Sequence, residues 1–119
     1  MAQNEEKRQE PGSGGLPQAE PVRLGELVEY APGAVVSRTV IKRPVGTVTL
    51  FSFDAGQGLS EHTAPFDALV QILDGRAELT IGGKVVQAEG GQTVLMPAHV
   101  PHSLHAADRF KMLLVMIRG

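Results

Sequence analysis

Apolar and polar residues alternate at intervals of two along most of this sequence, which is the pattern of half-buried β-strands. The clearest example is the stretch 76–81, RAELTI, where Ala77, Leu79 and Ile81 form one face. Similar stretches rich in β-branched residues recur at short intervals, and no long amphipathic helix interrupts them. The stretches predicted as strands are 34–41, 47–53, 68–73, 76–81, 84–88, 92–96, 102–107 and 110–117.

Glycine and proline residues separate these strands and predict the turns between them. Asp-Gly is a favoured two-residue hairpin sequence, so we expect the chain to reverse at Asp74-Gly75, and again at Gly82-Gly83 and Gly90-Gly91. We expect about nine or ten short strands in an antiparallel sandwich or barrel, with the jelly roll as the leading candidate. Periodicity alone does not choose between the jelly roll and other all-β barrels.

The first 21 residues differ in composition from the rest. They contain one leucine and no β-branched residue among many Gly, Pro, Gln and Glu, a composition that cannot offset the entropy of ordering the chain. We therefore predict a flexible N-terminal arm over 1–21 and one β-barrel domain over 22–119. The stretch 22–30, VRLGELVEY, is compatible with a short helix or a strand.

Composition and charge narrow the function classes. The formal net charge of −2 resides in residues 1–20, since the remainder carries equal numbers of acids and bases, and the chain has only five aromatic residues. Nucleic-acid binding is therefore not expected. No apolar run is long enough to cross a membrane, so no membrane partner is expected either. With no cysteine and no basic-apolar leader at its start, we expect a cytoplasmic protein.

Residues 56–75 carry the first recognisable motif. Gly56, five residues and then His62 open it, and Gly75 closes it. This stretch resembles the first signature of the cupin superfamily, G-x5-H-x-H-x3,4-E-x6-G. At the second histidine position this sequence has Ala64, and at the glutamate position it has Ala68.

A second motif follows after the short gap that is typical of small bacterial single-domain cupins. It resembles the signature G-x5-P-x-G-x2-H-x3-N. Gly91, Pro97 and His102 match, whereas His99 stands at the glycine position and Ala106 at the asparagine position. The resemblance implies an all-β fold, a single antiparallel double-stranded β-helix or jelly-roll barrel. It is less specific for chemistry, because the fold hosts many functions.

In metal-dependent cupins, three residues of the first signature and the histidine of the second bind one metal. Here the resemblance leaves His62 and His102, and two imidazoles alone hold a divalent metal poorly. His99 and Asp67 are the residues that could complete the set, and such a site would suit Fe, Mn, Ni, Cu or Zn. His105 lies an odd number of residues from His102, so we expect it on the opposite face of its strand.

Three functions remain open. The leading reading is a small barrel that binds a small organic molecule in a mouth lined by His62, His102, Ala64 and Ala68, with a degenerate or weak metal site. The first alternative is a metal-dependent enzyme, by resemblance a dioxygenase or isomerase, with His62, His99 and His102 as ligands. The second alternative is a structural or sensing module with a packed barrel and no pocket. Whether the protein is an enzyme is not decided by the sequence.

The last strand, 110–117, predicts a homodimer. Its sequence FKMLLVMI is apolar on both faces, and only one face can fill a barrel. An exposed apolar patch of this size is unusual on a monomer, so a second copy of the chain would cover the other face. The rival cover is the N-terminal region of the same chain.

Overall fold

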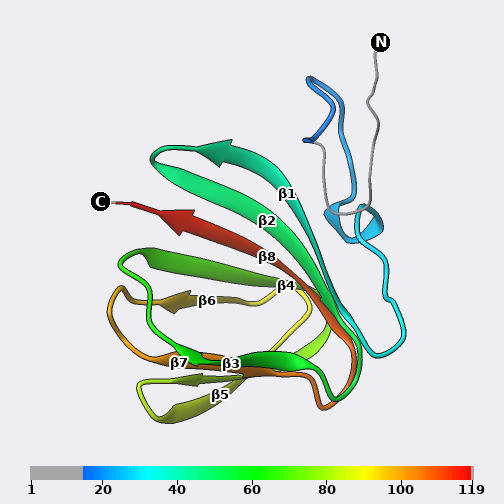
Figure 1. Cartoon of the computed structure of the whole chain (residues 1–119). Helices are drawn as coiled ribbons and strands as arrows, with labels where there is room; N and C mark the ends of the chain where they lie inside the picture. Colours follow the sequence, from blue (N-terminus) through cyan, green and yellow to red (C-terminus); the bar gives the residue numbers. More distant parts are fainter. Residues whose placement is uncertain (1–14, 119) are drawn as a thin grey trace.

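The computed structural model describes residues 15–118, in which eight strands from Val35 onward form one curled β-structure (Figure 1). No helix in this part of the chain is long and apolar enough to cross a membrane. The elements are η1 (Leu24–Glu26), β1 (Val35–Arg43), β2 (Gly46–Phe53), β3 (Gly58–His62), β4 (Asp67–Ile81), β5 (Lys84–Glu89), β6 (Thr93–Met96), β7 (His102–His105) and β8 (Phe110–Ile117).

All strand pairs are antiparallel, and they form two halves that face each other across the barrel interior. Sheet A contains β1, β2, β8, β6 and the first half of β4. Sheet B contains β3, β7, β5 and the second half of β4. Figure 1 shows sheet A above and sheet B below, with the chain curling from one to the other. The jelly-roll architecture predicted from the sequence is confirmed.

The predicted hairpin at Asp74-Gly75 is wrong. β4 continues through these residues as one strand and remains paired with β8, with a register shift between Ile72 and Asp74 and with Gly75 opposite Phe110. Gly75 has a φ of 77°, so an Asp-Gly pair here forms a bend of the strand rather than a reversal. Local turn chemistry permits both outcomes, and pairing with β8 up to Gly75 and with β5 and β7 beyond it selects the second. Joining 68–73 and 76–81 leaves seven of the predicted strands, and β3, which was not among them, brings the described strands to eight, fewer than the nine or ten expected.

Two other turns are as predicted. Gly82 and Gly83 close the β4–β5 hairpin, in which Ile81 pairs with Lys84, and both glycines have positive φ. Gly90 and Gly91 connect β5 to β6.

The barrel interior is filled by apolar side chains from both sheets. Phe53 and Phe110 are fully buried and stack with their ring centroids 4.5 Å apart. Around them lie the other buried members of this core, Ala68, Val70, Ile72, Ala77, Leu79, Ala88, Met96, Leu104, Ala106 and Met112. The interior is therefore a packed core over most of its length.

A second core lies on the outer face of sheet A, where the N-terminal segment covers it. Val28, Val40 and Leu50 are buried here, and Leu24, the first residue of the 3₁₀ turn η1, and Leu27, its C-cap, pack against them. Thus the stretch 22–30, left open between helix and strand, forms a single 3₁₀ turn that acts as a cover. Most of the predicted arm, 1–21, lies outside the described residues, but Leu16 within it is partly buried against this core.

The N-terminal cover leaves one apolar row of sheet A exposed, which we call the outer row. The strand register aligns Leu95, Leu69, Val115, Val48 and Ile41 side by side across β6, β4, β8, β2 and β1. Leu95, Leu69 and Ile41 are among the exposed large apolar side chains of the described residues.

Candidate functional site

The strand register brings several strand ends together at one end of the barrel, which we call the mouth. β3 ends at the mouth with His62, which pairs with His102 at the start of β7. β4 begins there, with Ala68 opposite Met96 of β6 and Met116 of β8. The β1–β2 hairpin and the end of β8 reach the same end because they pair with each other. In Figure 1 the mouth is at the left.

His62 and His102 form a close pair at the mouth. As cross-strand partners they project to the same side, and their rings meet edge to face with the centroids 4.4 Å apart. The two Nε2 atoms are 3.1 Å apart. His102 is 5% exposed, whereas His62 is exposed. The two histidines thus lie side by side, and their role as the centre of a ligand pocket stays a prediction.

The hydrogen-bond partner of Nδ1 indicates which nitrogen of each imidazole ring carries the hydrogen. Nδ1 of His62 is 2.8 Å from the carbonyl oxygen of Ser60, and Nδ1 of His102 is 3.2 Å from that of Val100. A carbonyl oxygen only accepts, so a ring that bonds to it through Nδ1 carries its hydrogen there, and in that neutral tautomer its Nε2 carries a lone pair. Two lone pairs that face each other at this distance repel unless a proton or a metal cation lies between them.

The environment favours the neutral form of His102. Burial is the main cause that lowers the pKa of His102 below its ordinary value; the hydrogen bond to the Val100 carbonyl raises it, and the nearby His62 lowers it. A neutral imidazole is the form that coordinates metals.

Ala64 and Ala68 stand at the two other ligand positions of the signature that this sequence resembles, and neither side chain can bind a metal. Ala68 is 2% exposed and belongs to the main core. Ala64 is half-buried, and its carbonyl oxygen accepts a hydrogen bond from the backbone of His99 at 2.8 Å.

His99 and Asp67 lie away from the histidine pair and hold the loop between β6 and β7. The carboxylate of Asp67 accepts a hydrogen bond from the backbone N–H of Ala98 at 2.9 Å. His99 is exposed and has a φ of 66°, the left-handed conformation for which the family signature has glycine. Within residues 15–118 no group of three His, Asp or Glu side chains is placed to hold a metal ion. The role of these two residues as metal ligands stays a prediction.

Sequence reasoning missed a cavity on the sheet A side of the mouth. It has a volume of about 440 Å³, and its lining includes three basic side chains, Lys42, Arg43 and Arg118. The net charge of residues 21–119 is zero, and this total hides a local excess of basic side chains. The signal that could have revealed it is the position of Lys42-Arg43 next to a Pro44 turn, at the end of the barrel that the last strand also reaches.

Comparison with known proteins gives the family. A family model described as "Cupin domain" matches residues 49–118. An uncharacterised protein of Streptomyces coelicolor is 34% identical over 59 residues, which are 50% of this chain and 56% of that protein. The match therefore spans little more than half of that relative's length.

Solved structures match over most of this chain. A conserved protein of unknown function from Streptococcus pyogenes has a TM-score of 0.84 and 38% identity, covering 88% of this chain and 92% of its own. A cupin superfamily protein from Desulfitobacterium hafniense has a TM-score of 0.83 and 30% identity, covering 88% and 96%.

Proposed function

Since this chain belongs to the Cupin domain family, we propose that it is a small barrel that binds a small organic molecule at its mouth, with His62 and His102 as the central polar groups. The cytoplasmic location expected from the composition is part of the same proposal. The observation that carries it is the pair of Nε2 atoms 3.1 Å apart, each on a ring whose Nδ1 lies beside a backbone carbonyl.

A weakly bound transition metal fits this pair. Two nitrogen ligands at about 2.0–2.1 Å from one metal lie about 2.9–3.4 Å apart at octahedral to tetrahedral angles, and the observed separation falls in that range. Metal-bound histidines commonly donate their second ring N–H to a backbone carbonyl, as both rings do here. Fe, Mn, Ni, Cu and Zn all accept imidazole ligands in suitable geometries.

Two protein ligands make such a site weak. The remaining positions would be filled by water or by oxygen atoms of the bound molecule, so an organic ligand and the metal would strengthen each other's binding. A bound metal would supply Lewis acidity at the mouth. The residues of the chain orient the two rings and keep His102 neutral.

The two alternatives have less support. A dioxygenase or isomerase site using His62, His99 and His102 needs a third ring near the pair, but His99 is exposed and its backbone is tied to Ala64. A structural module without a pocket does not account for the 440 Å³ cavity at the mouth.

The test is a titration of the purified, untagged protein with Zn²⁺ and Ni²⁺, followed by calorimetry. We expect weak binding of one ion per chain, reduced at least about tenfold by His62→Ala and by His102→Ala. His105→Ala is the matched control, because His105 is exposed. Equal binding by all four proteins would contradict the proposed role of the pair.

The pH dependence of this binding follows from competition with protons. Because burial lowers the pKa of His102, protons compete for this ring only below the ordinary imidazole range. We expect zinc affinity to be steady above neutral pH and to fall on acidification below about pH 6.5. Affinity that instead rises on acidification would point to ligands other than neutral imidazole.

We also propose that two copies of the chain pair through the outer row defined above. The N-terminal cover packs on part of the apolar outer face of sheet A, including Leu113 and Val48, but Leu95, Leu69 and Ile41 of the outer row stay exposed. Leu95 is 57% exposed in this row, and burying such side chains against a second copy would be favourable.

We expect light scattering to give a dimer for the wild type and a monomer for Leu95→Lys. Val85→Lys is the matched control, because Val85 is also 57% exposed but lies on β5 in sheet B. A wild type that is monomeric at high micromolar concentration would contradict the dimer.

A further inference from the structure

The cavity on the sheet A side of the mouth has the composition of an anion-binding site. Lys42 and Arg43 come from the β1–β2 hairpin, and Arg118 follows the end of β8. The lining also includes Thr47, Phe66 and Met116. No carboxylate is among the lining residues, so the cavity has a local excess of positive charge in a domain whose net charge is zero.

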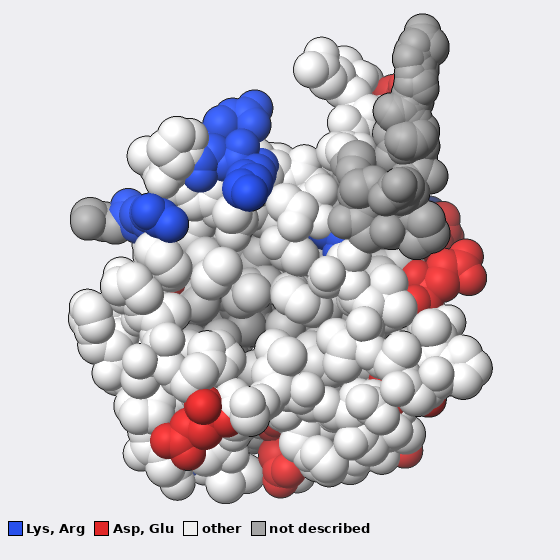
Figure 2. Space-filling view, viewed as in Figure 1, with Lys and Arg blue, Asp and Glu red and all other residues white. Residues whose placement is uncertain are grey.

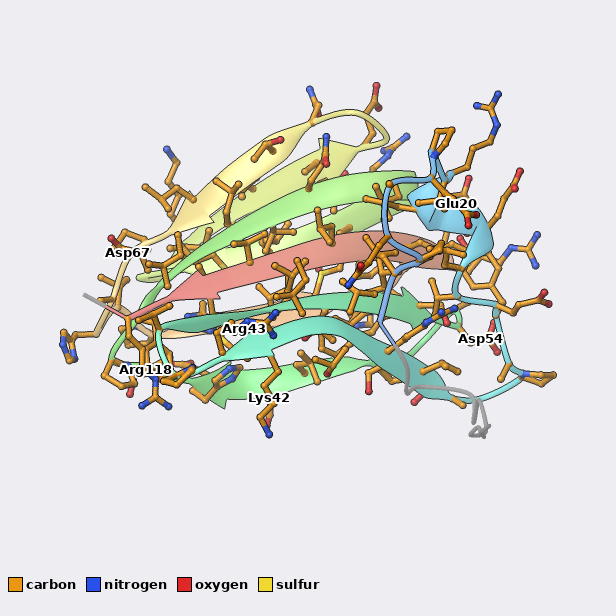
Figure 3. All side chains as sticks on the ribbon, turned by 90° about the horizontal axis from the view of Figure 1, so that it is seen from above. Glu20, Lys42, Arg43, Asp54, Asp67 and Arg118 are labelled. Carbon is orange, nitrogen blue, oxygen red and sulfur yellow. The ribbon has the colours of Figure 1, made fainter. Side chains whose placement is uncertain are left out.

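The figures place this charge on one side of the molecule. Figure 2 shows Lys and Arg gathered over the β1–β2 hairpin and next to the C-terminus, while the acidic groups of this face lie elsewhere. Figure 3 shows Lys42, Arg43 and Arg118 toward one end of the barrel, with Asp54 and Glu20 at the other end. Asp67 is at the same end as the bases, but its carboxylate is bound to the backbone of Ala98.

Arg118 is held in place at the cavity wall. Its backbone N–H donates to the carbonyl of Val45 at 2.8 Å, and its guanidinium lies 4.8 Å from the centre of the Phe66 ring. A guanidinium that stacks on an aromatic ring keeps its in-plane N–H groups for a carboxylate or a phosphate. Phe66 and Met116 also give the cavity an apolar surface beside this donor.

A buried hydroxyl group without a hydrogen-bond partner also belongs to the cavity lining. Thr47 Oγ1 is buried and has no hydrogen-bond partner among the described residues. Thr47 is part of the cavity lining and pairs with Lys42 on one side and Met116 on the other. An unsatisfied buried hydroxyl is costly, and a ligand oxygen or a water at the floor of the cavity would satisfy it.

We propose that this cavity binds a small organic acid, with Arg118 and Lys42 on its anionic group and Phe66 and Met116 against its apolar body. The volume is within the range of ordinary small-molecule sites and is far larger than a bare inorganic anion needs. This site goes beyond the proposed metal-binding pair: it lies at the same end of the barrel, but its lining includes neither His62 nor His102. It stands whether or not the pair holds a metal.

The experiment is a ¹H–¹⁵N NMR titration at physiological ionic strength with benzoate, which has a carboxylate on an apolar body. Benzyl alcohol serves as the neutral probe and acetate as the anion without a body. We expect benzoate to bind more tightly than either and to shift the signals of Thr47, Phe66 and Met116. Arg118→Gln and Lys42→Gln should each weaken benzoate binding about tenfold or more, because a charge-assisted hydrogen bond is lost.

Arg76→Gln is the matched control, because Arg76 is exposed in sheet B and donates to Gln87. It removes the same charge and should leave benzoate binding unchanged. Equal affinity for benzoate and benzyl alcohol, no shifts at the cavity, or equal losses in Arg76→Gln and Arg118→Gln would overturn the inference. So would loss of benzoate binding in His102→Ala with retention in Arg118→Gln. Arg118→Gln should retain zinc binding. Loss of benzoate binding with intact zinc binding is therefore distinguishable from failure of the histidine site.

Discussion

The double substitution Ala64→His/Ala68→Glu is expected to raise the affinity for Zn²⁺ or Ni²⁺ by at least about 100-fold. It supplies the two ligands that the family's first signature has at these positions, and so completes a set of four with His62 and His102. Residue 68 is suited to this because it faces the interior of the barrel and is 2% exposed. The buried carboxyl should lower the melting temperature of the metal-free variant, and added metal should restore it.

The matched control is the double substitution Ala64→His/Leu69→Glu, in which the carboxylate is moved by one residue. Successive side chains alternate along a strand, so Leu69 lies on the outer face of β4 and is 42% exposed. A carboxylate there cannot reach the histidine pair, so the affinity should rise only by the contribution of Ala64→His and stay well below that of the Ala64→His/Ala68→Glu variant. A gain of the same size with Ala64→His/Leu69→Glu, or no gain with Ala64→His/Ala68→Glu, would mean that the pair is not the centre of a metal site.

Gly75→Ala is expected to destabilise the protein by at least about 2–3 kcal/mol. Gly75 has a φ of 77° at the bend where β4 passes from sheet A to sheet B. A Cβ there would overlap the carbonyl oxygen of Arg109, a backbone atom that cannot move without disturbing the pairing of β4 with β8. The measurement is the free energy of unfolding in urea.

Gly33→Ala is the matched control for this substitution. Gly33 has a φ of 65°, but a Cβ there would have no neighbour within 4 Å. It should cost only the conformational penalty, about 1 kcal/mol. If the two variants lose equal stability, the contact with the Arg109 carbonyl does not contribute and the bend at Gly75 is less constrained than described.

The sequence predicted most of the strands, because the alternation of apolar residues and the glycine turns are local properties, but it did not predict β3 (Gly58–His62). It failed at Asp74-Gly75, where the local signal allows a hairpin or a bend and the choice depends on β8, which lies more than thirty residues later in the chain. It also did not predict the 3₁₀ cover, because Leu24 and Leu27 pack on an outer face whose location depends on the closed barrel.

The candidate site was predictable only in part. The spacing of the two motifs placed His62 and His102 together, but the partners of their Nδ1 atoms are backbone carbonyls, which no residue pattern reveals. The cavity was not predictable from charge, because Lys42 and Arg118 are distant in sequence and only the pairing of β1, β2 and β8 brings them to one wall.

The most direct measurement is NMR of the protein labelled with ¹⁵N in its histidine rings, recorded above neutral pH with and without Zn²⁺. His62 and His102 should both be neutral rings with the hydrogen on Nδ1, and zinc should shift both Nε2 signals while His99 and His105 remain unchanged. A hydrogen on Nε2 of either ring of the pair, or zinc shifts at His99 and His105 instead, would contradict the site described here.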